Sequence, residues 1–267
     1  MRTLLAAALT VVSLSPAPAR QTAEQLPLRA VRFYRADHRR TRVTAFLEIP
    51  CAAVDSSGSV YQVAFRITDS TGSTIGAESW KASVPAERRP GPCVVETVEF
   101  TVAPGRYRLE AAVKSPATGR ETRSAVDLEG FDHQPPVSDV LLSPAIRLVA
   151  PGDTVPQAGV LRRGGALVTA AALPRLGRSR TTAHYLLEVY AAGENEDAGT
   201  MSVWVEDSAG AVPLKWRPAP VPVQSGGSTL HGHVSLAGLS PGRYTLVVAV
   251  GRGGRTEERK ADFLFGE

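Results

Sequence analysis

The residues of this chain best suited to metal binding are two histidines, His231 and His233, which are separated by one glycine. In a strand, residues two apart lie on the same face, so both imidazoles could reach one metal ion. No cysteine lies in that half of the chain, and no acidic residue lies at a supporting distance in the sequence. We therefore predict no metal site and no cofactor. The simpler interpretation is that His231 and His233 are exposed strand residues, and they remain the weak candidate for a metal site.

No combination of a nucleophile, an acid and a base is recognisable elsewhere. The turns that begin at Asp55, Asp69 and Asp207 each offer oxygens to calcium, but each lacks the spaced carboxylates of a calcium loop. Asp, Ser and Gly together are typical of ordinary turns. The sequence has no Gly-x-Ser-x-Gly, His-Glu-x-x-His or Walker motif. We therefore expect no catalytic residues and a protein that is not an enzyme.

Three tryptophans, Trp80, Trp204 and Trp216, fall in predicted strands. Packing in a core or between sheets is the first expectation for such side chains. The alternative is that Trp204 and Trp216 form a ligand platform on which a sugar ring stacks. An aromatic content of 6% argues against that alternative.

The charge balance raises the question of an anionic partner, because 30 basic and 26 acidic residues give a net charge of +4. The densest basic clusters, residues 38–42 and 175–180, are not interleaved with aromatic residues. Single-stranded nucleic acid is bound by basic grooves that carry such aromatic residues. We therefore expect no nucleic acid partner.

One turn sequence occurs twice, since Pro-Gly-Arg-Tyr at residues 104–107 returns at residues 241–244 and leads into an apolar segment both times. An Asp-Ser-x-Gly turn and a Leu-Glu-aliphatic triplet recur at nearly the same offset. A constant offset of about one domain length indicates a duplicated unit.

The spacing of apolar and turn residues predicts an all-β protein made of two tandem immunoglobulin-like antiparallel β-sandwich domains. No segment has sustained helical periodicity. In the first half the predicted strands are residues 31–35, 42–49, 60–68, 73–84, 94–102, 106–114 and 122–128. In the second half they are residues 141–149, 167–172, 184–191, 201–206, 212–216, 230–236, 244–250 and 260–265, with a turn at 160–165.

The N-terminal segment predicts export. Arg2 precedes a short apolar run that ends in a small-x-small site at residues 17–19. This run is too short to span a membrane, and no later segment is apolar enough, so we expect a periplasmic or secreted protein without a transmembrane segment. The predicted divisions are a signal peptide (1–19), a flexible leader (20–28), a first β-sandwich domain (29–131), a proline-rich linker (132–139) and a second β-sandwich domain (140–267).

Cysteine usage agrees with an oxidising compartment, because Cys51 and Cys93 are the only two cysteines. In an immunoglobulin-like order, one closes the second strand and the other opens the fifth, and those ends are neighbours in one sheet. A disulfide between Cys51 and Cys93 is therefore predicted, with two independent buried thiols as the alternative. Tyr107 and Tyr244 resemble the tyrosine corner of immunoglobulin-like and fibronectin-like domains, so both are expected to be structural.

Several segments together resemble the β-domain portion of exported bacterial proteins that are named for a Gly-Trp-x-Thr-Asp (GWxTD) motif. These segments are residues 31–34, 102–107, 138–143 and 184–190, together with the Asp-Ser-x-Gly hairpins. The naming motif itself is absent from this chain. The resemblance implies exported immunoglobulin-like β-sandwich repeats, and it carries over no catalytic residue.

We therefore predict a non-enzymatic exported protein that acts as a protein–protein interaction or structural module of the bacterial envelope. The contacts would be made through sheet edges or loops. Its expected partner is another envelope or secreted protein. The alternative function is a carbohydrate or cell-wall binding module that uses the strand tryptophans.

Overall fold

The computed structural model describes residues 26–51, 54, 60–84, 94–150, 153, 159–179, 181–191, 199–221, 227–252 and 254–266. These residues form antiparallel sheets, apart from one short parallel pair, which confirms the all-β prediction. In this part of the chain, no helix is long and apolar enough to cross a membrane. The predicted signal peptide lies outside the described residues.

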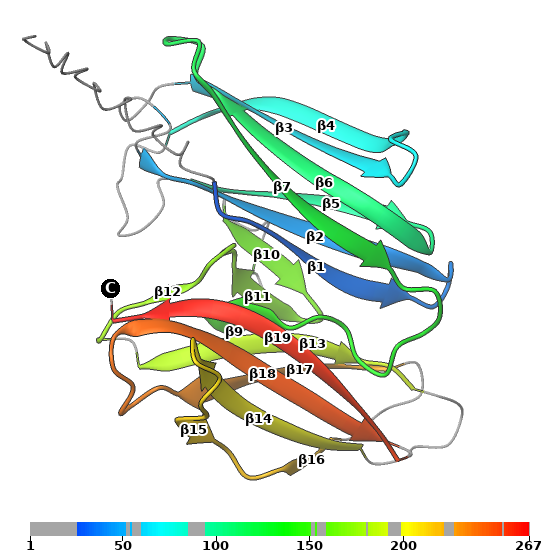
Figure 1. Ribbon diagram of the computed structural model, residues 1–267, viewed down its shortest axis with the longest axis vertical. Helices are drawn as coiled ribbons and strands as arrows, with labels where there is room; N and C mark the ends of the chain where they lie inside the picture. Colours follow the sequence, from blue (N-terminus) through cyan, green and yellow to red (C-terminus); the bar gives the residue numbers. More distant parts are fainter. Residues whose placement is uncertain are drawn as a thin grey trace, which may run out of the picture.

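The first sandwich contains the strands that alternation predicts. They are β1 (Leu28–Arg35), β2 (Arg40–Ile49), β3 (Val60–Asp69), β4 (Thr74–Ser83), β5 (Val94–Val102), β6 (Gly105–Lys114) and β7 (Glu121–Gly130). One sheet has the order β1-β2-β5 and the other the order β4-β3-β6-β7 (Figure 1). Because β4 pairs with β3 and not with the sheet of β1, the arrangement departs from constant-type immunoglobulin domains.

The end of the predicted flexible leader is part of this sandwich. Leu26 is only 3% exposed and packs in the first core, and β1 begins at Leu28. The reason is that these two leucines cover apolar surface at the start of the sheet. Residues 26–28 therefore belong to the first sandwich.

The second sandwich repeats the topology of the first. β8 (Leu141–Ser143), β13 (Thr182–Val189) and β17 (Ser228–Ser235) form a sheet of order β17-β13-β8. The opposite sheet contains β14 (Gly199–Asp207), β18 (Gly242–Arg252) and β19 (Arg255–Phe265), bordered by the short strands β12 (Arg175–Leu176), β15 (Leu214–Lys215) and β16 (Ala219–Val221). The shared strand order supports the duplication that the sequence indicates.

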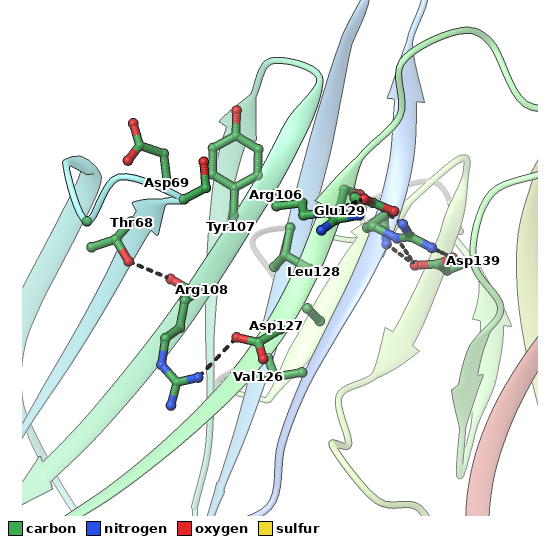
Figure 2. Close-up of a pocket in the computed structure, with 14 residues that line it drawn as sticks. Thr68, Asp69, Arg106, Tyr107, Arg108, Val126, Asp127, Leu128, Glu129 and Asp139 are labelled. Carbon is green, nitrogen blue, oxygen red and sulfur yellow. Dashed lines mark hydrogen bonds and ion pairs between the residues drawn. The ribbon is translucent and has the colours of Figure 1, made fainter.

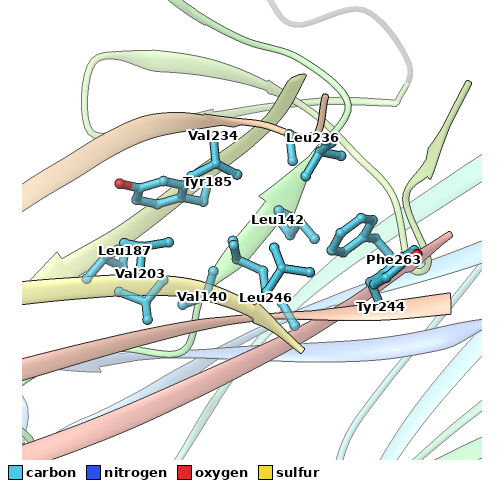
Figure 3. Close-up of a cluster of buried hydrophobic side chains, with 14 of the residues drawn as sticks. Val140, Leu142, Tyr185, Leu187, Val203, Val234, Leu236, Tyr244, Leu246 and Phe263 are labelled. Carbon is cyan, nitrogen blue, oxygen red and sulfur yellow. The ribbon is translucent and has the colours of Figure 1, made fainter. Parts of the chain in front are cut away.

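Each sandwich has its own apolar core. In the second, Leu142 and Tyr185 from one sheet meet Leu246 and Phe263 from the other (Figure 3). Complete burial of a large apolar side chain contributes roughly 1.5–3 kcal/mol relative to exposure. Two separate cores agree with two units that each fold around their own apolar centre.

An insertion distinguishes the second sandwich. β2 follows β1 directly, whereas β9 (Ile146–Leu148), β10 (Val160–Arg163), β11 (Ala166–Thr169) and β12 lie between β8 and β13. β10, β11 and β9 form a separate sheet, which lies between the two sandwiches in Figure 1. We call residues 146–176 the inserted segment. Its described residues contact both sandwiches.

Two sequence predictions fail in this region. The single strand expected over 141–149 is divided into β8 and β9, which belong to different sheets, because Pro144 cannot donate to a ladder and the chain turns there. The turn expected over 160–165 is a strand followed by a tight turn. Gly164 and Gly165 have φ values of 49° and 76°, which is the backbone of a two-residue hairpin.

The two corner tyrosines hold the chain at the starts of β6 and β18. The Tyr107 hydroxyl donates to the Ala103 carbonyl at 3.0 Å, and the Tyr244 hydroxyl donates to the Ser240 carbonyl at 2.8 Å. Both rings are buried. The same contact therefore occurs once in each sandwich.

Replacing either tyrosine with phenylalanine is expected to lower the free energy of unfolding by about 0.5–1.5 kcal/mol. Tyr107→Phe and Tyr244→Phe each remove one hydrogen bond but keep the buried ring. Urea denaturation of the full chain measures the change. Unchanged stability in both variants would show that the two hydrogen bonds contribute nothing beyond those made to water.

Candidate functional site

The tryptophans of the predicted ligand platform lie on different faces of the second sandwich. Trp204 alternates along β14 with Val203 and Val205, which face the core, so its side chain lies on the outer face. Its Nε1 donates to Glu206 Oε1 at 2.9 Å. Trp216 packs against the core itself. The two rings therefore do not form one stacking surface.

Trp80 is also a packing residue. Its ring stacks on Phe65 with a centroid separation of 5.7 Å and an interplanar angle of 21°, and it lies against the first core. Trp80 and Trp216 thus contribute to the two cores, whereas Trp204 covers the outer face of its sheet.

The predicted disulfide cannot be described as a pair, because Cys93 lies outside the described residues. Its neighbourhood is nevertheless arranged as the sequence predicts. Ile49 at the end of β2 is the register partner of Val94 at the start of β5. Cys51 follows the first of these strand ends, and Cys93 directly precedes the second in sequence. The disulfide stays a prediction.

A groove of about 920 Å³ opens on the first sandwich, lined by residues of β1, β6 and β7, by the end of β3 with its turn, and by Asp139. Figure 2 shows that most of its charged side chains lie in ion pairs, whereas Asp69 bonds within its own turn. Arg108 Nη1 lies 3.0 Å from Asp127 Oδ1, and Arg32 Nε lies 2.8 Å from Asp139 Oδ2. Because these charges neutralise each other locally, the groove does not present a strong field of either sign.

The most extensive buried contact outside the two cores is the junction between the sandwiches. A third apolar cluster lies there, formed by the outer faces of β1 and β2 against β8, β13 and the inserted segment. Its buried members are Val31, Phe33, Phe46, Leu141, Ala166, Val168, Ala170, Ala172 and Leu186. Since the other face of β2 lines the first core, this strand is buried on both faces.

Arg163 is the central charge of the junction. It is only 6% exposed, its Nε lies 3.0 Å from Glu188 Oε1, and its guanidinium carbon lies 3.7 Å from the ring centroid of Phe33. A second carboxylate, Glu99 of β5, lies 3.7 Å from Nη1. Burial lowers the pKa of Arg163, and Glu188 opposes that shift. One side chain of the inserted segment thus contacts both sandwiches.

Tyr190 extends this network to the backbone of β1. Its hydroxyl accepts a hydrogen bond from the Tyr34 amide at 2.6 Å and donates one to Glu188 Oε2 at 2.8 Å. Burial raises the pKa of Tyr190 above its ordinary value, so the phenol stays protonated and remains a donor. Glu188 therefore receives hydrogen bonds from both Arg163 and Tyr190.

Glu48 forms a second polar contact across the junction. This residue of β2 is 1% exposed, yet both of its carboxylate oxygens have partners in the inserted segment. Oε1 accepts from the Leu173 amide at 2.9 Å, and Oε2 accepts from Arg175 Nη1 at 2.5 Å. A buried carboxylate without such partners would be strongly unfavourable.

The predicted linker is also held in place. Val137 and Ser138 are completely buried, and the Ser138 amide donates to the Glu188 carbonyl at 2.8 Å. Asp139 binds Arg32 through both carboxylate oxygens, at 2.8 and 2.9 Å. Residues 137–139 are therefore part of the junction and do not act as a free tether.

Sequence reasoning missed these junction residues. Arg163 stands in an Arg-Arg-Gly-Gly segment that is typical of an exposed turn, and Glu48 and Glu188 stand at polar positions of alternating strands. The one available signal was the largely apolar segment 166–172. Its apolar residues do not alternate with polar ones, so burial of both faces of the segment is expected.

The two histidines chosen from the sequence both lie exposed on β17. The structure places His184 of β13 directly opposite His233. Within the described residues, no group of three or more His, Cys, Asp or Glu side chains is arranged to hold a metal ion.

Comparisons with known proteins do not identify a family. A scan against family models finds no match, and a search of curated proteins finds none. Solved structures similar to this chain include the BSP domain of a biofilm-associated protein (12% identity, TM-score 0.31, covering 85% of this chain and 27% of that one). Another is a Parabacteroides merdae β-glucuronidase (11% identity, TM-score 0.31, covering 84% of this chain and 27% of that one). At these TM-scores neither similarity carries an argument about function.

Proposed function

We propose that this chain is a non-enzymatic exported protein that serves as a structural or protein–protein interaction module of the bacterial envelope. The observation that carries the proposal is the junction. An apolar cluster and the buried Arg163 network join the two sandwiches. A pair of sandwiches joined in this way acts as one rigid body, which suits a spacer or a docking protein because it fixes the directions of its exposed edges.

The use of the buried charges supports a non-enzymatic role. Buried ionisable groups are the first candidates for catalytic chemistry in an unfamiliar protein. Here Arg163, Glu188 and Glu48 are engaged in contacts between the sandwiches. Their burial is thereby explained by assembly of the fold. Export is proposed from the signal-like residues 1–19 and from the resemblance to exported GWxTD proteins.

We propose that the partner is an envelope or secreted protein that contacts the β4 edge of the first sandwich. β4 is the last strand of its sheet and is exposed along most of its length. Ile75 on this strand is 48% exposed. An edge strand can accept a strand of another protein, and charges such as Glu78 and Lys81 restrict which strand will pair.

Site-specific photo-cross-linking in the producing cell tests this function. A cross-linking amino acid at Ile75 is expected to capture the same protein in repeated experiments. Val212 on the second sandwich, 47% exposed against 48% for Ile75, is the matched control and is expected to capture much less. If neither position captures protein and the purified chain instead retains cell-wall polysaccharide, the interaction proposal is wrong and the carbohydrate alternative replaces it.

A further inference from the structure

Two histidines from different strands of the second sandwich face each other. β13 and β17 are antiparallel, and their register makes His184 the direct partner of His233. The two ring centroids are 6.0 Å apart, and the ring planes are inclined by 46°. Directly opposed residues of an antiparallel pair have Cβ atoms about 4.5–5.5 Å apart, so the two side chains leave the sheet next to each other.

The pair lies on the outer face of its sheet. Ala183 and Tyr185, the neighbours of His184 along β13, belong to the core, so His184 lies on the opposite face. β17 is the edge strand of this sheet, and His233 is exposed. The rings can therefore adjust their side-chain torsions without disturbing the core.

The spacing of the rings fits one shared metal ion. With a metal–nitrogen distance of about 2.0–2.1 Å and a ring centre about 1.1 Å behind the nitrogen, the centroids of two ligating rings lie at most about 6.4 Å apart. That limit applies to a linear nitrogen–metal–nitrogen angle, and a tetrahedral angle brings the two centroids to about 5.2 Å. The observed 6.0 Å lies between these two values. Because His233 is exposed, its ring can rotate toward His184, and an approach of about 0.8 Å between the centroids gives the tetrahedral spacing.

The two rings influence each other electrostatically. Burial, followed by the proximity of His233, lowers the pKa of His184 below its ordinary value. Among the described residues, no carboxylate forms an ion pair with His184 or His233. Two of the other three histidines differ, because His38 and His133 each contact an adjacent aspartate.

We propose that His184 and His233 form a surface site for a divalent transition-metal ion, with water completing the coordination. Neutral imidazole favours Cu²⁺, Ni²⁺ and Zn²⁺ over Mg²⁺ and Ca²⁺. The site differs from the one that the sequence suggests, because its second ligand is a cross-strand residue and not His231. It is independent of the proposed interaction function.

The test is a titration of the full exported chain with Ni²⁺ and Zn²⁺ by isothermal calorimetry. One site that is absent for Mg²⁺ is expected. Partners that merely support a metal ligand change affinity by about 10–100-fold, so His184→Ala and His233→Ala should each weaken binding by at least tenfold. His231→Ala is the matched control from the same strand and should bind within about threefold of the unchanged protein.

Two results would overturn the proposal. One is a loss of affinity in His231→Ala and His233→Ala but not in His184→Ala, which would assign the metal to the i, i+2 pair of β17. The other is binding that disappears only when His38 and His133 are replaced together. Thermal melts of each variant without metal show whether it is folded, and His184→Asn serves as a second variant if His184→Ala does not fold.

Discussion

Replacing Arg163 with alanine is expected to lower the free energy of unfolding by about 3–5 kcal/mol, because removal of one member of a buried ion pair leaves the other charge without its partner. Glu188 would keep the hydrogen bond from the Tyr190 hydroxyl but lose the ion pair with Arg163, whose Nε lies 3.0 Å from Oε1. Phe33 would lose the cation that lies 3.7 Å from its ring centroid. Urea denaturation of the full chain, followed by tryptophan fluorescence, measures the loss.

Arg162→Ala is the matched control for this experiment. Arg162 precedes Arg163 on β10 and is exposed, so its replacement should change the free energy of unfolding by no more than about 0.5 kcal/mol. A similar small loss in both variants would contradict the view that Arg163 joins the sandwiches. A double-mutant cycle that combines Arg163→Ala with Phe33→Ala then isolates the energy of the contact between the guanidinium and the ring. A coupling energy of about 1–2 kcal/mol is expected.

The mode of unfolding provides a further readout of the same variant. With the junction intact, the two sandwiches are expected to unfold in one transition, because each one buries surface of the other. In Arg163→Ala the coupling is weaker, so the transition should broaden or divide into two. A single sharp transition in both proteins would mean that the apolar cluster alone couples the sandwiches.

The first sandwich was predictable because its strands alternate and its turns are marked by local sequence. β3, for example, buries Tyr61, Val63, Phe65 and Ile67 on one face and ends in an Asp-Ser-Thr-Gly turn. Such a pattern depends only on residues near one another in the chain. The approximate strand positions follow from it, whereas the pairing of β2 with β5 was predicted from the immunoglobulin-like strand order and the two separate units from the repeated sequence.

The junction was not predictable because it depends on contacts between distant segments. Phe46 and Glu48 alternate with core residues of β2, and in an isolated sandwich their face would meet water. They are buried because the inserted segment and the strands β8 and β13 cover this face. In the same way, the contact of His184 with His233 follows from the register of two strands that are far apart in sequence. No local pattern specifies which distant segment buries the outer face of β2 or in which register β13 pairs with β17.

The other large effect is expected from the disulfide predicted between Cys51 and Cys93. The chain-entropy account assigns about 4 kcal/mol to a crosslink that closes a loop of this size. The pairing of Ile49 with Val94 holds the two strand ends side by side, so the crosslink would join positions that the sheet already brings together. Native geometry then requires little adjustment, which favours the full stabilisation.

Peptide mapping of the protein, purified without reductant, should therefore recover the two cysteines in one linked fragment. Adding a reductant should lower the urea midpoint of the native protein but not that of the Cys51→Ser/Cys93→Ser double variant, which has no bond to lose. If both thiols react with iodoacetamide in the untreated protein, the alternative of two independent thiols is correct. In that case the pairing of β2 with β5 is maintained by the ladder and the core alone, since those contacts do not depend on the crosslink.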